Sequence, residues 1–351
     1  MGDFQEHLDE ASTVDELRSS ITRLSRQLQK EKHKTEELVN AVYTAVRDST
    51  AGLKIPEIPK PVKDKRKSGQ QTAVAVLSDW QLGKQTPGYT SPICEKRIEL
   101  YAEKLEHIVE LHRATTPIKE LKIYLLGDIV EGEQIFPGQP HLIDSSLYQQ
   151  MTVDGPRILC NFIRRMLAVF EKVHVVGVIG NHGSIGGRMR REYNGETNAD
   201  RMLYNICRQI LEPEKRLSWF IPWEKDARAW YAVDRIGDHA FLLAHGDQIR
   251  GGFGGFPFYG LAKKTWGWAA GGIDEEFNEV IIGHWHQPTR VTLNSITARV
   301  NGSTESHNTY AQENLAAQGR PSQWLLLVHP KHGVTAEYCV YLANKSHTKN
   351  G

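Results

Sequence analysis

Residues that could bind metal ions or transfer protons follow five short apolar runs of this sequence. The runs span residues 73–77, 122–126, 173–179, 240–244 and 279–282. Two carboxylates, one amide and three imidazoles follow them: Asp79, Asp128, Asn181, His245, His284 and His286. Such a mixture of oxygen and nitrogen donors suits Mn²⁺, Fe or catalytic Zn²⁺ better than Ca²⁺, which binds oxygen only. So many donors exceed the needs of one transition ion that also binds substrate, so they indicate two divalent ions with a bridging carboxylate.

The elements that must position these residues can be read from the same apolar runs. Short aliphatic and β-branched runs are typical of buried strands, and apolar residues at helical spacing predict helices over 95–113, 156–171 and 198–211. Alternating strands and helices predict a layered α/β fold with ligands at the carboxyl ends of the strands. The later runs predict consecutive strands in a second, more antiparallel sheet: 290–300, 323–328 and 334–341.

Five short motifs follow one another in a fixed order between residues 71 and 305. They are Asp79-Trp80-Gln81, Gly127-Asp128-Ile129-Val130-Glu131, Gly180-Asn181-His182-Gly183, Ala244-His245-Gly246 and Gly283-His284-Trp285-His286. In this order they resemble the motifs of the calcineurin-like metallophosphoesterases. The resemblance implies a layered α/β/β/α sandwich and an enzyme, a hydrolase acting on phosphoester bonds.

The resemblance also implies a role for each motif residue. The metal ligands it implies are Asp79, Gln81, Asp128, Asn181, His245, His284 and His286, and the catalytic residues are His182, Asp128 and Asn181. Asp128 would bridge the ions, Asp79 and His286 would belong to the first ion, and Asn181, His245 and His284 would hold the second. Two cations lower the pKa of a bridging water, so that hydroxide can attack phosphorus near neutral pH. His182 would then assist the leaving group by protonating its oxygen.

Two positions depart from the family pattern. Gln81 stands where the family usually has a histidine, and an amide ligates only weakly through oxygen, so we expect a looser first ion and dependence on Mn²⁺. Gly183 stands where the family usually has the acid that orients the catalytic histidine. Loss of such an orienting partner typically lowers metal affinity or activity about 10–100-fold. Glu131 is a candidate to replace that acid.

Two loops carry the sequence information on substrate. Arg188 and Arg191 follow the third motif and could grip phosphates, or they could belong to a solvated helix entrance. Residues 247–272 combine Arg250 and two lysines with six aromatic residues, which could stack on unpaired bases or pack into the core.

These loops favour nucleic acid as the substrate. The preferred hypothesis is a Mn²⁺-dependent DNA nuclease similar to SbcD-type repair exonuclease subunits, and bacteriophage-encoded metallophosphoesterases resemble the arrangement equally. One alternative is a phosphatase or phosphodiesterase for a small phosphoester, nucleotide or phosphoprotein. The other is a catalytically weak binding module on the same fold, because of Gln81 and Gly183.

The remaining sequence predicts three segments. Residues 1–50 form a helical, coiled-coil-like extension with an apolar heptad seam, which could pair with a second copy, bind a partner helix or lie on its own catalytic domain. Residues 51–71 are expected to form a basic, Pro-rich linker with a local charge of +4, which predicts a solvated spacer. Residues 72–351 are expected to form the metallophosphoesterase domain.

Composition limits the classes of protein that this chain can belong to. Its net charge is +1, so any binding of nucleic acid must be local rather than driven by the whole molecule. No apolar run reaches the length of about 18 residues that a membrane span needs, and the N-terminus lacks a signal sequence, so we expect a cytoplasmic protein. Its four cysteines lie far apart and predict free thiols.

Overall fold

The computed structural model of the protein describes residues 19–27, 30, 37, 41, 44, 57–185, 197–222, 229–250, 256–306, 313 and 319–343. The chain divides into two compact units, Met1–Ala51 and Gly52–Gly351. All described residues of the first unit are helical, and Ile21 and Leu24 of the expected seam are exposed. Pairing through this helix stays a prediction.

Six strands form the first sheet of the second unit, in the order β11-β10-β1-β2-β3-β4. Its strands are β1 (Gln71–Leu77), β2 (Ile118–Leu125), β3 (Lys172–Gly177), β4 (Leu217–Phe220), β10 (Ser322–His329) and β11 (Gly333–Tyr341). β1, β2, β3 and β4 run parallel, whereas β10 pairs antiparallel with both β1 and β11.

Five strands form the second sheet, in the order β5-β6-β7-β9-β8. They are β5 (Tyr231–Ile236), β6 (His239–Ala244), β7 (Glu279–Ile282), β8 (Thr289–Leu293) and β9 (Ile296–Val300). β6, β7 and β9 run parallel, and the two edge strands are antiparallel to their neighbours.

One sequence expectation about the sheets is wrong. The runs 323–328 and 334–341 form strands as predicted, but these strands are β10 and β11 of the first sheet, not part of the second. β10 lies against the free edge of β1, with Thr72 opposite Val328, and so buries an otherwise unpaired central strand. β4 and β5 were not predicted, because both are edge strands with a weak apolar pattern.

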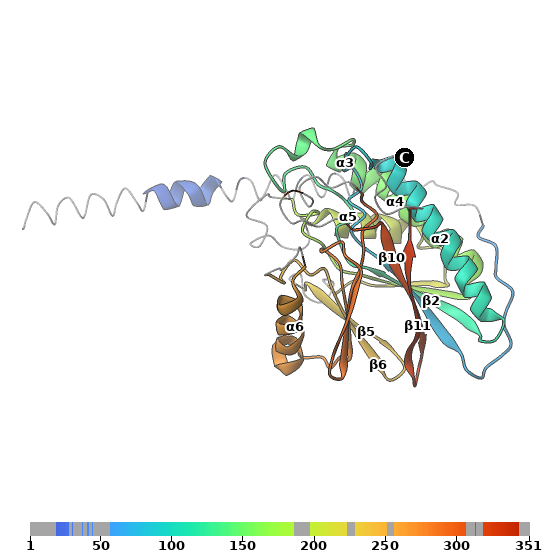
Figure 1. Ribbon diagram of the computed structural model, residues 1–351. Helices are drawn as coiled ribbons and strands as arrows, with labels where there is room; N and C mark the ends of the chain where they lie inside the picture. The colour runs from blue at the N-terminus through green and yellow to red at the C-terminus, as the bar shows by residue number, and fades with distance from the viewer. Residues whose placement is uncertain are drawn as a thin grey trace, which may run out of the picture. The chain divides into compact units, whose positions relative to one another are not determined.

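Helices cover the outer faces of both sheets (Figure 1). The predicted helices are confirmed as α2 (Ser91–Arg113), α4 (Gly155–Val169) and α5 (Ala199–Ile210), which lie over the first sheet. Three short turns precede α4: η1 (Gln139–His141), α3 (Leu147–Gln149) and η2 (Gln150–Asp154). On the outer face of the second sheet lie α6 (Phe258–Gly267) and η6 (Trp268–Gly272). The layers are therefore α/β/β/α, as expected.

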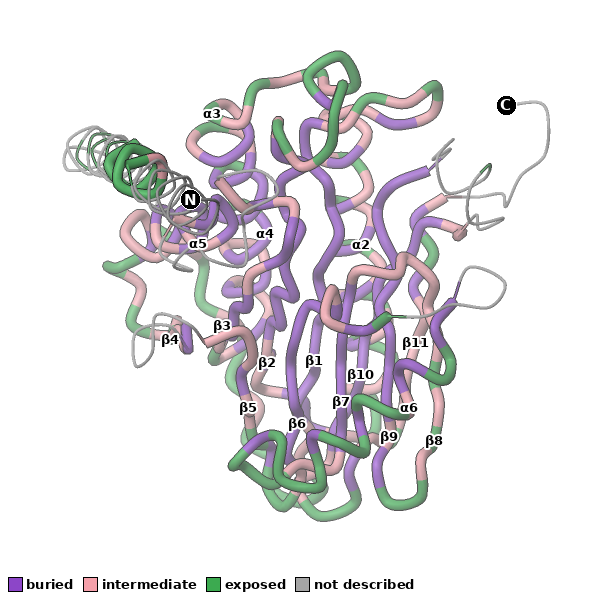
Figure 2. The backbone as a smooth tube through the Cα atoms, turned by 90° about the vertical axis from the view of Figure 1, so that its left-hand side faces the viewer, coloured by how far each residue is buried: buried purple, intermediate pink, exposed green. Residues whose placement is uncertain are grey.

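The two sheets bury the core between them, and β1, β6, β7 and β10 are buried over nearly their whole length (Figure 2). Val74, Tyr124 and Val176 of the first sheet share one apolar cluster with Phe241 and Ile281 of the second. Since helices cover the other face of the first sheet, β1 is buried on both sides, which explains its unbroken apolar run.

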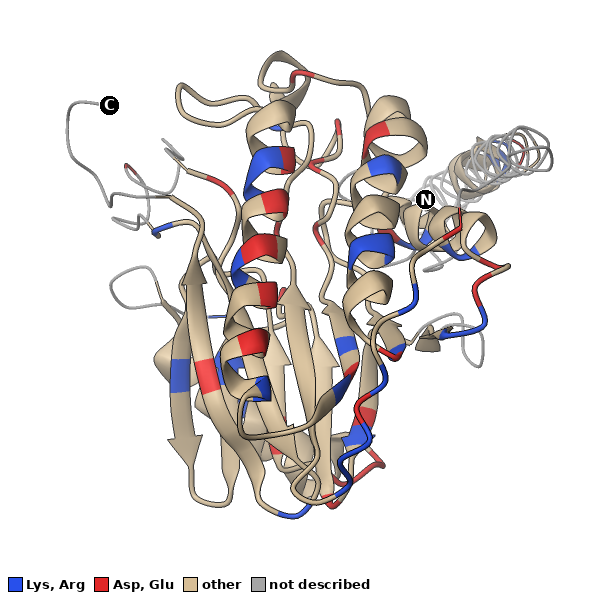
Figure 3. Cartoon of the chain, turned by 90° about the vertical axis from the view of Figure 1, so that its right-hand side faces the viewer, with Lys and Arg blue, Asp and Glu red and all other residues tan. Residues whose placement is uncertain are grey.

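The surface of the described residues mixes both charge signs. On the outer face of α2, acidic and basic side chains are interspersed along the helix (Figure 3). The four cysteines are free thiols, as predicted. Among the described residues, no helix combines the length and the hydropathy that a bilayer span requires.

Candidate metal centre

The carboxyl ends of neighbouring parallel strands bring the motif residues together. Asp79, Asp128 and Asn181 follow β1, β2 and β3 of the first sheet, and His245 follows β6 of the second. Nδ1 of His245 donates a hydrogen bond to the carbonyl oxygen of Leu126 (2.7 Å), which joins the two sheet edges. Because this hydrogen bond engages Nδ1, Nε2 is the ring atom of His245 that can act as a ligand atom.

Four donors converge at what we call the second position, defined by Asp128, Asn181, His245 and His284. Nε2 of His245 lies 3.0 Å from Oδ2 of Asp128 and 3.2 Å from Oδ1 of Asn181. Nδ1 of His284 lies 3.2 Å from the same Nε2 atom. The ligand atoms of Asp128, His245 and His284 all lie within 4.8 Å of one another, so this group could hold a metal ion.

Asp79 and His286 define the first position, which Asp128 is expected to share. Nε2 of His286 lies 3.3 Å from Oδ1 of Asp79 and 3.2 Å from the side-chain nitrogen of Gln81. The Asp79 carboxylate also accepts hydrogen bonds from the backbone N–H of His284 (2.9 Å) and from Oγ of Ser78 (2.5 Å). His284 therefore links the two positions through its backbone and its ring.

Five of the motif residues have a left-handed backbone conformation, which non-glycine residues rarely adopt. They are Asp79, Gln81, Asp128, His284 and His286, with φ between 45° and 71°. Among the described non-glycine residues, only Asn294 of the β8–β9 turn shares this conformation. Each such residue costs on the order of 1–3 kcal/mol, and this strain is typical of functional sites. The fold thus stabilises a costly arrangement at these strand ends.

Two glycines allow the strand ends to approach the carboxylates closely. A Cβ atom on Gly180 would meet Oδ1 and the backbone nitrogen of Asp128. A Cβ atom on Gly283 would lie 2.5 Å from Oδ2 of Asp79. Any larger residue at either place would push a carboxylate away from its neighbours.

The electrostatics of the cluster favour positive charge. Burial by itself would lower the pKa of His245, but the Asp128 carboxylate raises it to about 10. Burial would also lower the pKa of His286, but the carboxylates of Asp79 and Glu305 raise it to about 10. Burial together with the neighbouring His245 ring holds the pKa of His284 well below its usual range, which leaves this imidazole neutral and able to ligate. The buried carboxylates and imidazoles therefore fit a divalent cation.

His182 lies beside the ligands and is held by Glu131. Its Nδ1 donates to the carbonyl oxygen of Glu131 (2.9 Å) and lies 3.2 Å from Oε2 of that side chain. Its backbone N–H donates to Oδ1 of Asp128 (2.7 Å), and its Nε2 lies 4.0 Å from Oδ2. Burial opposes protonation of His182, but the carboxylates of Asp128 and Glu131 raise its pKa to about 9.

The geometry also explains the glycine at position 183. A Cβ atom on Gly183 would lie 2.5 Å from Oδ1 of Asn198, the residue that caps α5. An acidic side chain has no room there, and Glu131 occupies the place beside His182 instead.

Asp200 is a buried site residue that sequence reasoning missed. Its carboxylate accepts hydrogen bonds from the backbone N–H groups of Asp128 (2.9 Å), Ile129 (3.0 Å) and Gly180 (2.9 Å). It thereby ties the loops after β2 and β3 to the start of α5. In the sequence it reads only as an acidic residue in the first turn of a helix, which is a common surface feature.

Lys84 and Glu305 are two further residues that the sequence did not single out. Nζ of Lys84 lies 2.9 Å from Oε1 of Glu305 and donates to Oε1 of Gln81 (2.8 Å). Oε2 of Glu305 lies 3.2 Å from Nδ1 of His286. No local pattern marks either residue, because they reach the site from loops more than 200 residues apart.

The residues proposed to contact substrate are only partly described. Arg188 and Arg191 lie outside the described residues. Arg250 is described and exposed, and its role as a substrate contact stays a prediction.

The aromatic residues after His245 divide between core and surface. Phe256 and Trp268 are buried, whereas Phe258, Tyr259 and Trp266 expose 57%, 79% and 46% of their surface. A chain of ring contacts runs outward from the ligand cluster: His284 to Trp285 (5.4 Å), Trp285 to Phe256 (6.4 Å) and Phe256 to Phe258 (4.6 Å). The exposed aromatic surface of α6 is therefore connected to a ligand side chain by packed rings.

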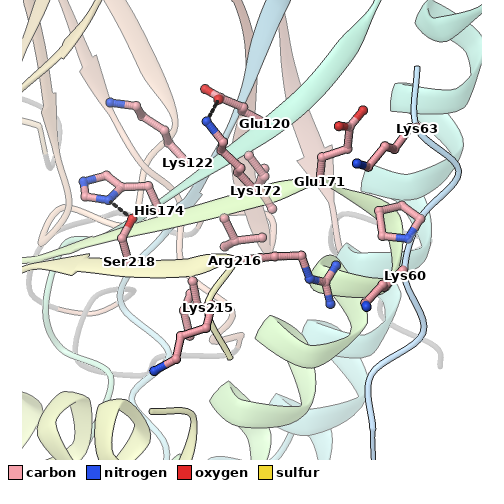
Figure 4. Close-up of a pocket in the computed structure, with 14 residues that line it drawn as sticks. Lys60, Lys63, Glu120, Lys122, Glu171, Lys172, His174, Lys215, Arg216 and Ser218 are labelled. Atoms are coloured by element: carbon pink, nitrogen blue, oxygen red, sulfur yellow. Dashed lines mark hydrogen bonds and ion pairs between the residues drawn. The ribbon is translucent and has the colours of Figure 1, made fainter. Parts of the chain in front are cut away.

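A basic groove of about 750 Å³ lies at the opposite ends of β2, β3 and β4 (Figure 4). Its charged lining residues are Lys60, Lys63, Lys122, Lys172, Lys215, Arg216, Glu120 and Glu171. The linker forms one side of this groove: the backbone N–H of Asp64 donates to Glu171 (3.0 Å), and Arg66 donates to the carbonyl oxygen of Arg113 (2.8 Å). The segment 57–67 therefore contacts the domain at Asp64 and Arg66, while most of its residues are exposed, and its role as a solvated spacer stays a prediction.

Comparisons with known proteins find similarity to solved structures alone. No protein-family model matches the chain, and no curated protein sequence matches it. Vacuolar protein sorting 29 from Cryptosporidium parvum is 14% identical, with a TM-score of 0.36 over 77% of this chain and 99% of that one. The wild-type protein of the same name from Entamoeba histolytica, complexed with Zn²⁺, is 13% identical, with a TM-score of 0.34 over the same two shares.

An archaeal phosphodiesterase is also similar. It is 10% identical, with a TM-score of 0.33 over 76% of this chain and 99% of that one. Such distant similarities carry no statement about activity, which must be inferred from the residues of this chain.

Proposed function

We propose that this chain is a metal-dependent phosphodiesterase that cleaves DNA. The observation that carries the proposal is the convergence of carboxylate, amide and imidazole donors from five strand ends, with His182 held beside Asp128. Two cation positions beside a fixed imidazole are the arrangement that phosphoryl transfer needs, because the phosphoryl oxygens and the leaving oxygen both carry charge.

We assign one divalent ion to each of the two positions of the metal centre. Asp128, Asn181, His245 and His284 would hold one ion, and Asp79, His286 and Asp128 the other. Mn²⁺ suits this mixture of oxygen and nitrogen donors, as would Fe or Zn²⁺. When bound, the ions supply a nucleophile at neutral pH and neutralise the phosphoryl oxygens.

His182 is proposed as the acid that protonates the leaving oxygen. Since Glu131 holds Nδ1, the other ring nitrogen, Nε2, is the one that can donate a proton to substrate, and it lies 4.0 Å from Oδ2 of Asp128. Asp200 keeps this geometry by fixing the backbone of both loops. Arg188, Arg191 and Arg250 stay proposed substrate contacts.

The choice of DNA rests on two surface features. Exposed aromatic rings on α6 can stack on unpaired bases, and Lys263 and Lys264 of the same helix are close to them in sequence. The basic groove offers a second patch for phosphates. The narrower similarity to SbcD-type nucleases belongs to this proposal and rests on the sequence motifs.

Degradation of labelled single- and double-stranded DNA in Mn²⁺ tests the function. We expect cleavage that EDTA abolishes and that His182→Ala reduces by about 10²–10⁴-fold, the usual contribution of a general acid. His112→Ala, which removes an imidazole hydrogen-bonded to Tyr338 in the last turn of α2, is the matched control and should cleave normally. Turnover of a small diester without DNA cleavage would indicate that the substrate is a small phosphoester rather than DNA. Absence of both activities would favour a binding module.

A further inference from the structure

A lysine ammonium lies beside the first position of the metal centre. The side chain of Lys84 is only 14% exposed, and its Nζ contacts Oε1 of Gln81 (2.8 Å) and Oε1 of Glu305 (2.9 Å). Glu305 in turn contacts Nδ1 of His286, whose other ring nitrogen faces Asp79. Lys84 is therefore one residue removed from His286 and two from Asp79, the ligands that define this position.

The ammonium fixes the orientation of the Gln81 amide. An ammonium group only donates hydrogen bonds, so the oxygen of the amide and not its nitrogen must face Lys84. The amide nitrogen then lies 3.2 Å from Nε2 of His286, the ring atom available to an ion. The one atom of Gln81 that can ligate a cation is thus already engaged by Lys84.

Charge acts in the same direction as this geometry. The Lys84 ammonium neutralises the Glu305 carboxylate that contacts His286, so less negative charge remains near this position to stabilise a bound divalent ion. In the described part of the chain, no hydrogen bond or ion pair joins a lysine or arginine to the donors of the second position, where acidic and imidazole donors from three residues lie within 4.8 Å of one another. The nearest cationic group is His182, with Nε2 4.0 Å from Oδ2 of Asp128. Among the described residues, no comparable group of three gathers at the first position.

We infer that Lys84 weakens the first position by holding the Gln81 oxygen and by adding positive charge, so that the centre binds one ion firmly and the other loosely. This inference rests on the proposed metal centre and adds a positioning residue to it. It reverses the usual expectation for a buried polar residue, because removal of Lys84 should improve binding rather than impair it.

Calorimetric titration of the full chain with Mn²⁺ alone tests the inference. The wild type is expected to bind one ion tightly and a second more weakly. Lys84→Met should tighten the weaker ion about tenfold, the lower end of the effect of outer partners on metal affinity, and leave the tight ion unchanged. Lys84→Arg retains the charge and should behave as the wild type.

Lys122→Met is the matched control. Lys122 is buried to the same extent, with a side chain 15% exposed, but its ammonium pairs with Asp234 (2.6 Å) away from the ligands. Both affinities should stay unchanged. The tight ion also reports folding, since its ligands come from four different strand ends.

A second variant keeps the inference testable if Lys84→Met does not fold. Gln81→Ala leaves the Lys84–Glu305 pair intact and should change the weaker affinity less than threefold, whereas loss of a true ligand would cost 10-fold or more. Equal affinities for two ions in the wild type, or weaker binding in Lys84→Met, would overturn the inference and leave the proposed function standing. A wild type that binds no Mn²⁺ would instead overturn the proposed function.

Discussion

At the scale of single residues, the centre depends on side chains that touch the ligands rather than only on the ligands. Glu131 is buried and holds His182 through both its carbonyl oxygen and its carboxylate. Asp200 has the corresponding role for the backbone of Asp128 and Gly180. Such partners fix the direction of a ring or a loop, which a reaction at a phosphate requires.

Replacement of Glu131 by Gln should lower turnover about 10–100-fold, because the amide keeps the shape but loses the charge that holds and orients His182. Steady-state kinetics on a small diester measures the effect, which is expected in kcat more than in KM. Glu106→Gln, which removes an ion pair with Arg165 between two surface helices, serves as the control. Wild-type kcat in Glu131→Gln would show that His182 is oriented without this carboxylate.

At the scale of elements, the sequence predicted what lies at the strand ends better than how the sheets are assembled. The runs before Asp79, Asp128 and His245 are strongly apolar because their strands are buried on both faces. Both the strands and the motifs that follow them could therefore be predicted from the sequence. The sequence did not show which sheet contains β10 and β11, because an antiparallel strand has the same apolar pattern in either sheet. Lys84 and Asp200 were missed because Lys84 pairs with Glu305 and Asp200 binds the backbone of Asp128, and both partners are distant in sequence.

The close approach of the loops after β2 and β3 gives a prediction at this scale. Gly180→Ala should destabilise the fold by about 1–3 kcal/mol, since its methyl group would meet Asp128, and should weaken binding of Mn²⁺. Gly267→Ala in α6 is the matched control: its Cβ meets no atom within 4 Å, so we expect a gain of about 0.5–1 kcal/mol. Chemical denaturation measures both. A neutral Gly180→Ala would mean that the two loops can separate without loss of stability.

At the scale of the whole molecule, a net charge of +1 gives no general attraction for DNA. Local patches must therefore supply any binding. The groove beside the linker gathers six basic and two acidic side chains, and several of its cations already have partners, such as Lys122 with Asp234. Lys60 and Lys215 are exposed on different segments that border it (Figure 4). They are the cations best placed to meet a phosphate backbone.

Reversal of charge at Lys60 and Lys215 should therefore weaken DNA binding and lower its dependence on salt. Each lost contact with a single strand removes about 0.7 from the slope of log K against log salt concentration. Fluorescence anisotropy with a labelled oligonucleotide at several salt concentrations measures both quantities, while turnover of a small diester should stay unchanged. Lys96→Glu with Lys331→Glu alters the net charge equally at exposed lysines outside the groove. If both pairs of substitutions weaken binding alike, the groove has no special part in it, and α6 becomes the surface that DNA must use.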